Sequence, residues 1–176
     1  MHLDDSAKGS IRNCTFDFGL GGDSSYSAWW QEGGHLVWEG GHVFSVDAHD
    51  GAVYLSDVTA DIRGVSLVAN TAISGAGITA YQSTVQIQNS RFENNTAESG
   101  AAFFGSEVEV DILACIFDHN TAAGTGACHF QGSRVNFVDV VFQRSVPRAI
   151  FMQHGESLSL SMSRFTGVSL CLCASV

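Results

Sequence analysis

One phrase of this sequence returns at a fixed interval. "RFENNTAESGAAFF" begins at Arg91, and the similar "IFDHNTAAGTGACHF" begins at Ile116, 25 residues later. Aligning the copies gives an apolar, mostly aromatic column of Leu67, Phe92, Phe117, Phe142 and Phe165, and three residues further on a column of Asn70, Asn95 and Asn120, followed by Ser145. Self-similarity at one period indicates a chain built from stacked copies of a small unit.

Each copy also contains two strand-like segments. Ahead of the aromatic column stand two apolar columns, Ala60, Val85, Val110, Val135, Leu158 and Ile62, Ile87, Ile112, Phe137, Leu160. Members of the two columns lie two residues apart, so on a strand they point to the same side. A second segment follows each bend and begins at Ala52, Ala76, Ala101, Ala127 and Ala149. The copies differ slightly in length, which is typical of fixed strands joined by corners of variable length.

A period near 25 residues is too short for a propeller blade of roughly 40 to 50 residues, and the leucine framework of a leucine-rich repeat is missing. The pattern predicts an all-β fold, a single-stranded parallel β-helix (β-solenoid) with about 25 residues per coil and roughly six or seven coils. Like residues of successive coils then stack. We therefore expect the aromatic column to form a ladder of rings inside the tube. The Asn column should form a turn ladder whose amides bond from coil to coil.

The whole chain, 1–176, is predicted to be one β-helix domain, with the regular repeats over 57–166. Residues 17–32, "DFGLGGDSSYSAWWQE", are longer than a corner needs, so we expect a loop insertion that carries Trp29 and Trp30. The last residues, "SLCLCASV", are apolar and lack a polar cap. Because a bare solenoid end exposes strand edges, we expect a neighbouring domain or subunit to cover the C-terminal coil.

The motifs resemble a known family. "FENN" and "FDHN", followed by "SGAAF" and "TGACHF", resemble the repeat of the polymorphic outer membrane proteins (Pmp), over roughly 62–166. Two departures are plain: Ser-Gly-Ala or Thr-Gly-Ala replaces the Gly-Gly-Ala of that family, and Ser145 replaces the fourth Asn. The resemblance implies a right-handed β-helix, an extracellular or cell-surface location, and an adhesive or structural role. It carries over no catalytic residue.

The charge balance excludes some partners. Eighteen acidic residues stand against eight basic ones, for a net charge of -10. Nucleic acid is therefore not an expected partner, and an anionic membrane surface is disfavoured. Membrane insertion is not expected either, because no stretch approaches the ~20 apolar residues that span a bilayer. The first residues, "MHLDDSAKGS", lack the apolar segment of a secretory signal.

The outer surface offers one candidate binding stripe. If the inward columns are assigned correctly, their neighbours Tyr54, Ile78, Phe103, His129 and Phe151 face outward in a line, with Trp29 and Trp30 in the nearby loop. Such a stripe could stack sugar rings or dock a protein partner. The alternatives are that another segment covers the stripe, or that the parity is inverted and these side chains form the core.

No catalytic residue, metal site or cofactor is predicted. Glu107, Glu109 and Asp111 alternate on one strand, where they could hold a cation or simply be solvated. The leading hypothesis is a non-enzymatic, extracellular or cell-surface repeat module that binds a protein or a glycan. One alternative is a carbohydrate-active β-helix enzyme, similar to a polysaccharide lyase or a glycosidase. Another is a small structural subunit of a larger assembly.

Overall fold

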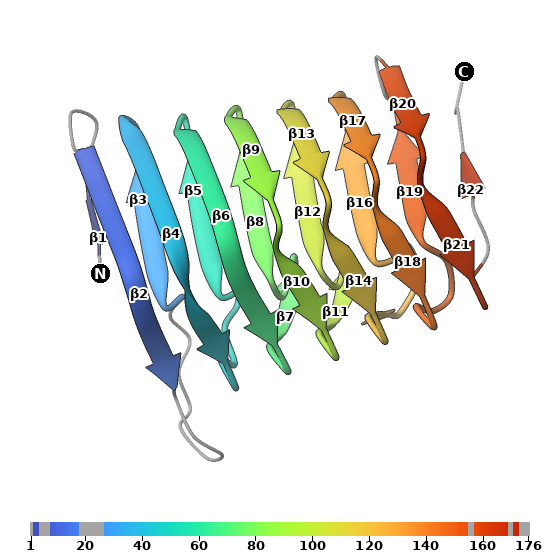
Figure 1. Ribbon diagram of the computed structural model, residues 1–176, viewed down its shortest axis with the longest axis horizontal. Coiled ribbons are helices and arrows are strands. Elements are labelled where there is room, and N and C mark those ends of the chain that lie inside the picture. Colours follow the sequence, from blue (N-terminus) through green and yellow to red (C-terminus); the bar gives the residue numbers. More distant parts are fainter. Residues whose placement is uncertain (1, 4–7, 18–26, 155–156, 169–170, 173–176) are drawn as a thin grey trace.

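The computed structural model describes residues 2–3, 8–17, 27–154, 157–168 and 171–172. Within these residues the chain forms a parallel β-solenoid of about six turns with about 25 residues per turn, as the repeat predicted. Successive coils lie side by side along the long axis, from the N-terminal to the C-terminal end (Figure 1). The inward side chains of each coil pack against those of the neighbouring coils and form the core. The outward side chains do not belong to this core.

Three parallel sheets run along the tube, here called A, B and C. Sheet A consists, in spatial order, of β1 (His2–Leu3), β3 (Trp29–Glu32), β5 (Val53–Ser56), β8 (Ile78–Tyr81), β12 (Phe103–Ser106), β16 (Cys128–Gln131), β19 (Ile150–Gln153) and β22 (Cys171–Leu172). Sheet C consists of β7 (Thr71–Ser74), β11 (Thr96–Ser99) and β15 (Thr121–Ala122). Sheet A lies behind sheet B in Figure 1.

Sheet B is the largest and has two halves in its later coils. Three long strands open it: β2 (Lys8–Asp17), β4 (His35–Phe44) and β6 (Thr59–Val68). Its upper half continues through β9 (Thr84–Gln88), β13 (Glu109–Leu113), β17 (Arg134–Val138) and β20 (Ser157–Ser161). Its lower half continues through β10 (Arg91–Glu93), β14 (Ile116–Asp118), β18 (Val141–Gln143) and β21 (Arg164–Thr166). Register is kept throughout, because a slip of one residue would turn every apolar side chain outward.

The aromatic column forms a ladder inside the tube. Leu67 pairs with Phe92, and Phe92 with Phe117. Phe117 pairs in turn with Phe142, and Phe142 with Phe165. Neighbouring rings lie nearly parallel, with centroids 4.7, 4.7 and 5.2 Å apart from Phe92 to Phe165. The repeat therefore places one ring directly on the next, which buries aromatic area at each step along the core.

The Asn column forms a second ladder at the corner after the lower half of sheet B. The Asn70 amide donates to Asn95 Oδ1 over 3.0 Å, and the Asn95 amide donates to Asn120 Oδ1 over 3.0 Å. In the next coil Ser145 replaces Asn, and its Oγ accepts the Asn120 N–H over 3.3 Å. The left-handed backbone of this corner lies one residue before the column, at Ala69, Asn94, His119 and Arg144. The Asn side chains therefore serve the inter-coil bonds rather than the backbone bend.

The structure tests only part of the predicted loop over 17–32. Residues 18–26 lie outside the described residues. The loop prediction is wrong at its two ends, because Asp17 closes β2 and Trp29–Glu32 form β3. The four residues of β3 alternate as a strand requires, with Trp29 and Gln31 buried and the two others half-buried. Regular pairing also starts earlier than predicted, since β2 is already in register with β4.

The last described coil leaves part of its apolar side open. Leu160 pairs with Phe137, yet Leu160 is 36% exposed whereas Phe137 is fully buried. Met162, at the corner position that exposed Asp139 occupies one coil earlier, is 79% exposed but does not point inward. Phe165 is half-buried although its ring stacks on Phe142. Inward side chains of this coil therefore have a neighbour on one side and an accessible surface on the other.

Candidate functional site

Outward-facing rings of sheet A form one continuous line. Its members, here called the aromatic row, come from six successive strands: Trp30, Tyr54, Tyr81, Phe104, His129 and Phe151. Trp30 stacks on Tyr54 with centroids 3.9 Å apart, and Tyr54 lies 5.8 Å from Tyr81. Tyr81 lies 5.8 Å from Phe104, and Phe104 meets His129 edge-on at 5.2 Å. His129 then meets Phe151 edge-on at 4.9 Å, so the contact is unbroken from β3 to β19.

This row corrects the stripe predicted from the sequence. Tyr54 and Phe151 lie half-buried on the outer face, as predicted. The prediction of an exposed side chain is wrong for His129, which lies on that face but is buried. It is also wrong for Ile78 and Phe103, which point inward and are fully buried. Trp29 is also buried, so only its neighbour Trp30 belongs to the row.

The error has a simple geometric cause. The alignment set the five Ala residues that precede these strands in one column, but β5 pairs Val53 with Ile78 rather than with Gly77. The corners before β8 and β12 each hold one extra residue, Gly77 and Ala102, ahead of the strand. Because side chains alternate along a strand, one extra residue exchanges inside for outside.

Tyr81 keeps the row continuous where the register position itself is not aromatic. Thr79 pairs with Tyr54 and with Phe104, and its hydroxyl is buried against the chain, donating to the Ser74 carbonyl over 2.8 Å. The Tyr81 ring, from two residues further along β8, contacts the rings on both sides. Burial raises the pKa of both tyrosine hydroxyls, so they stay protonated and can donate hydrogen bonds at neutral pH.

His129 is the one titratable ring of the row apart from the tyrosines. It is 4% exposed, and its Nδ1 is hydrogen-bonded to the Ser99 hydroxyl. Its Nε2 is buried and has no hydrogen-bond partner among the described residues. Burial lowers its pKa to about 4, with Gln153 acting in the opposite direction. Since an efficient general base has a pKa near the working pH, this Ser–His pair is not set up for nucleophilic catalysis at neutral pH.

A charged cluster lies on the lower half of sheet B, around the buried carboxylate of Asp118. Arg144 donates two hydrogen bonds to it, from Nε over 3.0 Å and from an Nη over 2.7 Å. His119 Nδ1 lies 2.9 Å away, and Arg91 approaches to 3.9 Å. Burial acts to raise the pKa of Asp118, but hydrogen bonds from Arg144 and Gln143 outweigh it and the pKa is lowered. The carboxylate is therefore held ionised and joins neighbouring coils, and it is a poor proton donor.

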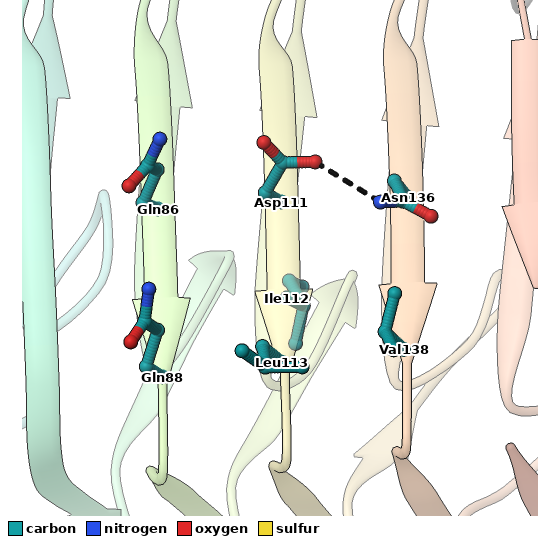
Figure 2. A pocket seen from close by; sticks show the side chains of 7 residues that line it. All are labelled: Gln86, Gln88, Asp111, Ile112, Leu113, Asn136 and Val138. Atoms are coloured by element: carbon teal, nitrogen blue, oxygen red, sulfur yellow. Dashed lines mark hydrogen bonds between the residues drawn. The ribbon is translucent and has the colours of Figure 1, made fainter. Parts of the chain in front are cut away.

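A shallow groove lies on the outer face of the upper half of sheet B (Figure 2). It measures about 240 Å³ and is lined by Gln86, Gln88, Asp111, Ile112, Leu113, Asn136 and Val138. Gln86, Asp111 and Asn136 are register neighbours on β9, β13 and β17. Gln88, Leu113 and Val138 form the parallel row two residues further along. Nothing in the repeat pattern pointed to this groove, because its residues occupy outward positions that differ from coil to coil.

The groove is polar, and one interaction orders it. Asn136 Nδ2 donates to Asp111 Oδ1 over 3.2 Å, which fixes both side chains across two coils (Figure 2). The lining contains one carboxylate, whereas glycoside hydrolysis ordinarily needs two. Nor does the lining hold an Arg, Lys or His that could act as a lyase base beside that carboxylate. Its chemistry suits hydrogen bonding rather than proton transfer.

The acidic trio named above does not converge. Glu109 pairs with Arg134 at 3.5 Å, and Glu107 accepts from the Gln82 amide over 3.3 Å. Asp111 belongs to the groove. Over the described ranges of the chain, no group of three His, Cys, Asp or Glu side chains is placed to hold a metal ion.

Comparison with known proteins gives one match. The model of the family described as "Right handed beta helix region" matches residues 2–167. Neither the curated proteins nor the solved structures gave a match. The narrower resemblance to the Pmp repeat stays a prediction. Among the described residues, no helix has the length and apolar character to cross a bilayer.

Proposed function

Because the chain belongs to the right-handed β-helix family, we propose that it is a non-enzymatic repeat module that binds an extended partner along its outer faces. Its expected place is outside the cell or at the cell surface, and its role there is adhesive or structural. The observation that carries this proposal is the aromatic row, in which six rings stay in contact from Trp30 to Phe151.

The row has the composition of a recognition surface. Trp30, Tyr54, Tyr81 and Phe151 are half-buried, so each keeps some accessible ring while its neighbours hold it rigid. Rigid aromatic side chains with polar tips lose little conformational entropy on binding and are enriched at interfaces. Arg148 lies over the Phe151 ring at 5.3 Å and adds a cation at one end. Phe104 and His129 are buried, so a partner that lies along the tube would meet the accessible rings of Trp30, Tyr54, Tyr81 and Phe151.

The groups with acid or base chemistry support binding over catalysis. Asp118 is held ionised by Arg144, and His129 has a pKa of about 4. The groove on sheet B holds a single carboxylate, Asp111. The competing hypothesis of a lyase or glycosidase needs an acid and a base, or two carboxylates, beside one substrate bond.

The apolar side of the last described coil favours a further role as part of an assembly. Leu160 is exposed there, next to the half-buried Phe165, and Met162 is exposed at the adjoining corner. We propose that a neighbouring domain or subunit covers these side chains. Light scattering on the chain and on a Leu160→Ser/Met162→Ser variant tests this. The wild-type chain should self-associate, or bind its neighbour, more strongly than the variant, and equal behaviour would contradict this role.

Binding itself is tested on a glycan array and by affinity capture from an extracellular extract. Tyr54→Ser/Tyr81→Ser removes the centre of the row, and Ile73→Ser serves as the control, because Ile73 is 43% exposed and lies on sheet C. We expect the double variant to bind at least about tenfold more weakly, which corresponds to about 1.4 kcal/mol. Undiminished binding by the double variant, or turnover of a polysaccharide by the wild-type chain, would overturn the proposal.

A further inference from the structure

We propose that the groove on the outer face of sheet B binds an uncharged glycan chain that runs along the tube axis, across β9, β13 and β17. This inference rests on the proposed function, a non-catalytic binding module. It gives that module a second surface, separate from the aromatic row on sheet A, and it names the class of ligand.

Several hydrogen-bonding groups in the groove have no partner within the described part of the protein. Among the described residues, the Gln86 and Gln88 amides make no hydrogen bond, and both point out of the sheet (Figure 2). Asp111 uses Oδ1 to accept from Asn136, which leaves Asp111 Oδ2 and Asn136 Oδ1 as acceptors. A carboxamide offers both donors and an acceptor in one rigid group. A sugar hydroxyl also donates and accepts, so each amide can bind one hydroxyl, or two adjacent ones, without a charge.

The spacing of the polar side chains suits an extended glycan chain. Gln86, Asp111 and Asn136 are register neighbours on adjacent parallel strands, which lie about 4.8 Å apart. The polar groups therefore recur along the axis at an interval similar to the advance of one pyranose ring in an extended chain. A glycan laid along the axis would meet one hydrogen-bonding side chain for each sugar ring. The hydrogen bond between Asp111 and Asn136 already holds two of these side chains in place in the free protein, which lowers the entropy cost of binding.

An apolar strip lies beside the polar row. Leu113 is 39% exposed and Val138 is half-buried, and both stand in the groove next to Gln88. An exposed Leu in a polar surface has little to gain from water. It can pack against the C–H face of a sugar ring whose hydroxyls bond to the amides. Ligand sites commonly combine an apolar surface with a few placed polar groups in this way.

The charges around the groove favour a neutral ligand. The two arginines that flank the groove are both engaged with carboxylates, Arg63 with Asp61 and Arg134 with Glu109. An acidic sugar would therefore meet Asp111 without a compensating cation, on a chain whose net charge is -10. A neutral hydroxyl donating to Asp111 Oδ2 makes a charge-assisted hydrogen bond instead. We therefore assign the groove to neutral glycans.

The test is affinity electrophoresis followed by calorimetric titration with neutral polymers (mannan, xylan, β-glucan, galactan) and with polygalacturonate as the acidic comparison. The groove variant is Gln86→Ala/Asn136→Ala, and the matched control is Thr96→Ala, an exposed residue of sheet C. Removing two hydrogen-bonding side chains should weaken binding of at least one neutral polymer by about tenfold or more. Thr96→Ala should leave this binding unchanged.

Asp111 provides a second, sharper variant. Asp111→Asn keeps the acceptor that faces Asn136 and should reduce binding only a few-fold, whereas Asp111→Ala should reduce it as strongly as the double variant. Binding should also survive a chelator, because no bridging cation is invoked. Loss of binding on chelation would overturn the inference in favour of a cation-mediated contact.

The outcomes separate this inference from the proposed function. If a glycan binds and the row variant Tyr54→Ser/Tyr81→Ser loses it while the groove variant keeps it, the groove inference fails and the binding module stands. If only polygalacturonate binds, or no polymer binds, the groove inference also fails. If a neutral polymer is cleaved, the proposed function itself fails. Binding of a neutral polymer that only the groove variants abolish supports the inference.

Discussion

The Asn ladder makes a prediction whose magnitude can be worked out from single hydrogen bonds. Asn95 is fully buried at its centre. Its Oδ1 accepts from the Asn70 backbone N–H over 3.1 Å and from the Asn70 amide over 3.0 Å. Its Nδ2 donates to the Leu67 carbonyl over 2.9 Å and to Asn120 Oδ1 over 3.0 Å. One side chain thus makes four bonds to three residues on two neighbouring coils.

Three substitutions of Asn95 should destabilise the chain to different extents. Asn95→Ala leaves the buried Asn70 N–H without its acceptor, and an unsatisfied buried group costs about 1–3 kcal/mol. With the loss of the other bonds we expect about 3 kcal/mol. Asn95→Ser should cost only about 1 kcal/mol, because Ser145 fills the equivalent position one coil beyond Asn120 and still accepts its N–H.

Asn95→Asp should be the most damaging of the three at neutral pH. It keeps the acceptor toward Asn70 but turns a carboxylate oxygen toward two other oxygens, on Leu67 and Asn120. Protonation restores a donor, so the pKa of this Asp is raised in the folded state. Relative to the wild-type chain, the variant should therefore gain stability as the pH falls, which Asn95→Ala should not do.

Urea unfolding followed by circular dichroism measures these differences as shifts of the midpoint at constant slope. Thr96→Ala, an exposed change on the adjacent residue, is the control and should shift the free energy of unfolding by less than about 0.5 kcal/mol. The expected order of stability is wild type, Ser, Ala, Asp. An Asn95→Ala variant as stable as the Thr96→Ala control would refute the claim that the amide ladder holds the coils together. An Asp variant as stable as the Ser variant would refute the assigned direction of the Nδ2 bonds.

Two further predictions concern pH and backbone geometry. Burial lowers the pKa of His129 from 6.5 to about 4. The contribution of the neutral imidazole to the free energy of unfolding is therefore fully present above pH 6.5 and is lost as the pH falls toward 4. This pKa shift corresponds to about 3 kcal/mol of unfolding free energy, and His129→Phe should abolish that part of the pH dependence. If the free energy of unfolding varied with pH in the same way in the variant, burial of His129 would not be the cause. Gly75→Ala should cost about 2 kcal/mol or more in urea unfolding, because φ is +54° and its Cβ would lie 2.3 Å from the Ile78 carbonyl oxygen. Gly124→Ala meets nothing within 4 Å and should be neutral or stabilising, and equal effects of the two would argue against the strain.

The sequence alone predicted the inward columns of sheet B and the Asn corner well, although it placed Ile78 and Phe103 of sheet A on the outside. Each inward position is constrained by the coils before and after it, so Phe117 must match both Phe92 and Phe142 in size and register. Because this match in size and register is needed in every coil, similar residues recur at the same position of each repeat, and an alignment of the repeats detects them. The register of sheet B followed directly, and so did the partners of the Asn amides.

The outer surface was harder to predict, because few inter-coil constraints act on it. Its residues meet solvent, so neighbouring coils can differ, and the groove combines Gln86, Asp111 and Asn136 at a single register position. On sheet A the corners also vary in length, and one extra residue, Gly77, was enough to exchange Ile78 with its outward neighbour. The hydrophobicity of the two residues did not reveal this exchange, because the outward neighbour, Thr79, is fully buried as well.

The same difference between inside and outside explains where recognition can arise in such a chain. Inward columns cannot vary without losing the ring and amide ladders, so they cannot encode a partner. An outward contact requires only that one side chain of the coil extends into the aromatic row. Tyr81 does so, although it lies two residues beyond Thr79. The continuity of the aromatic row is therefore not a by-product of the repeat, since the repeat at that position supplies Thr79. A ring brought in from another position to close the gap agrees with the proposed binding of an extended partner.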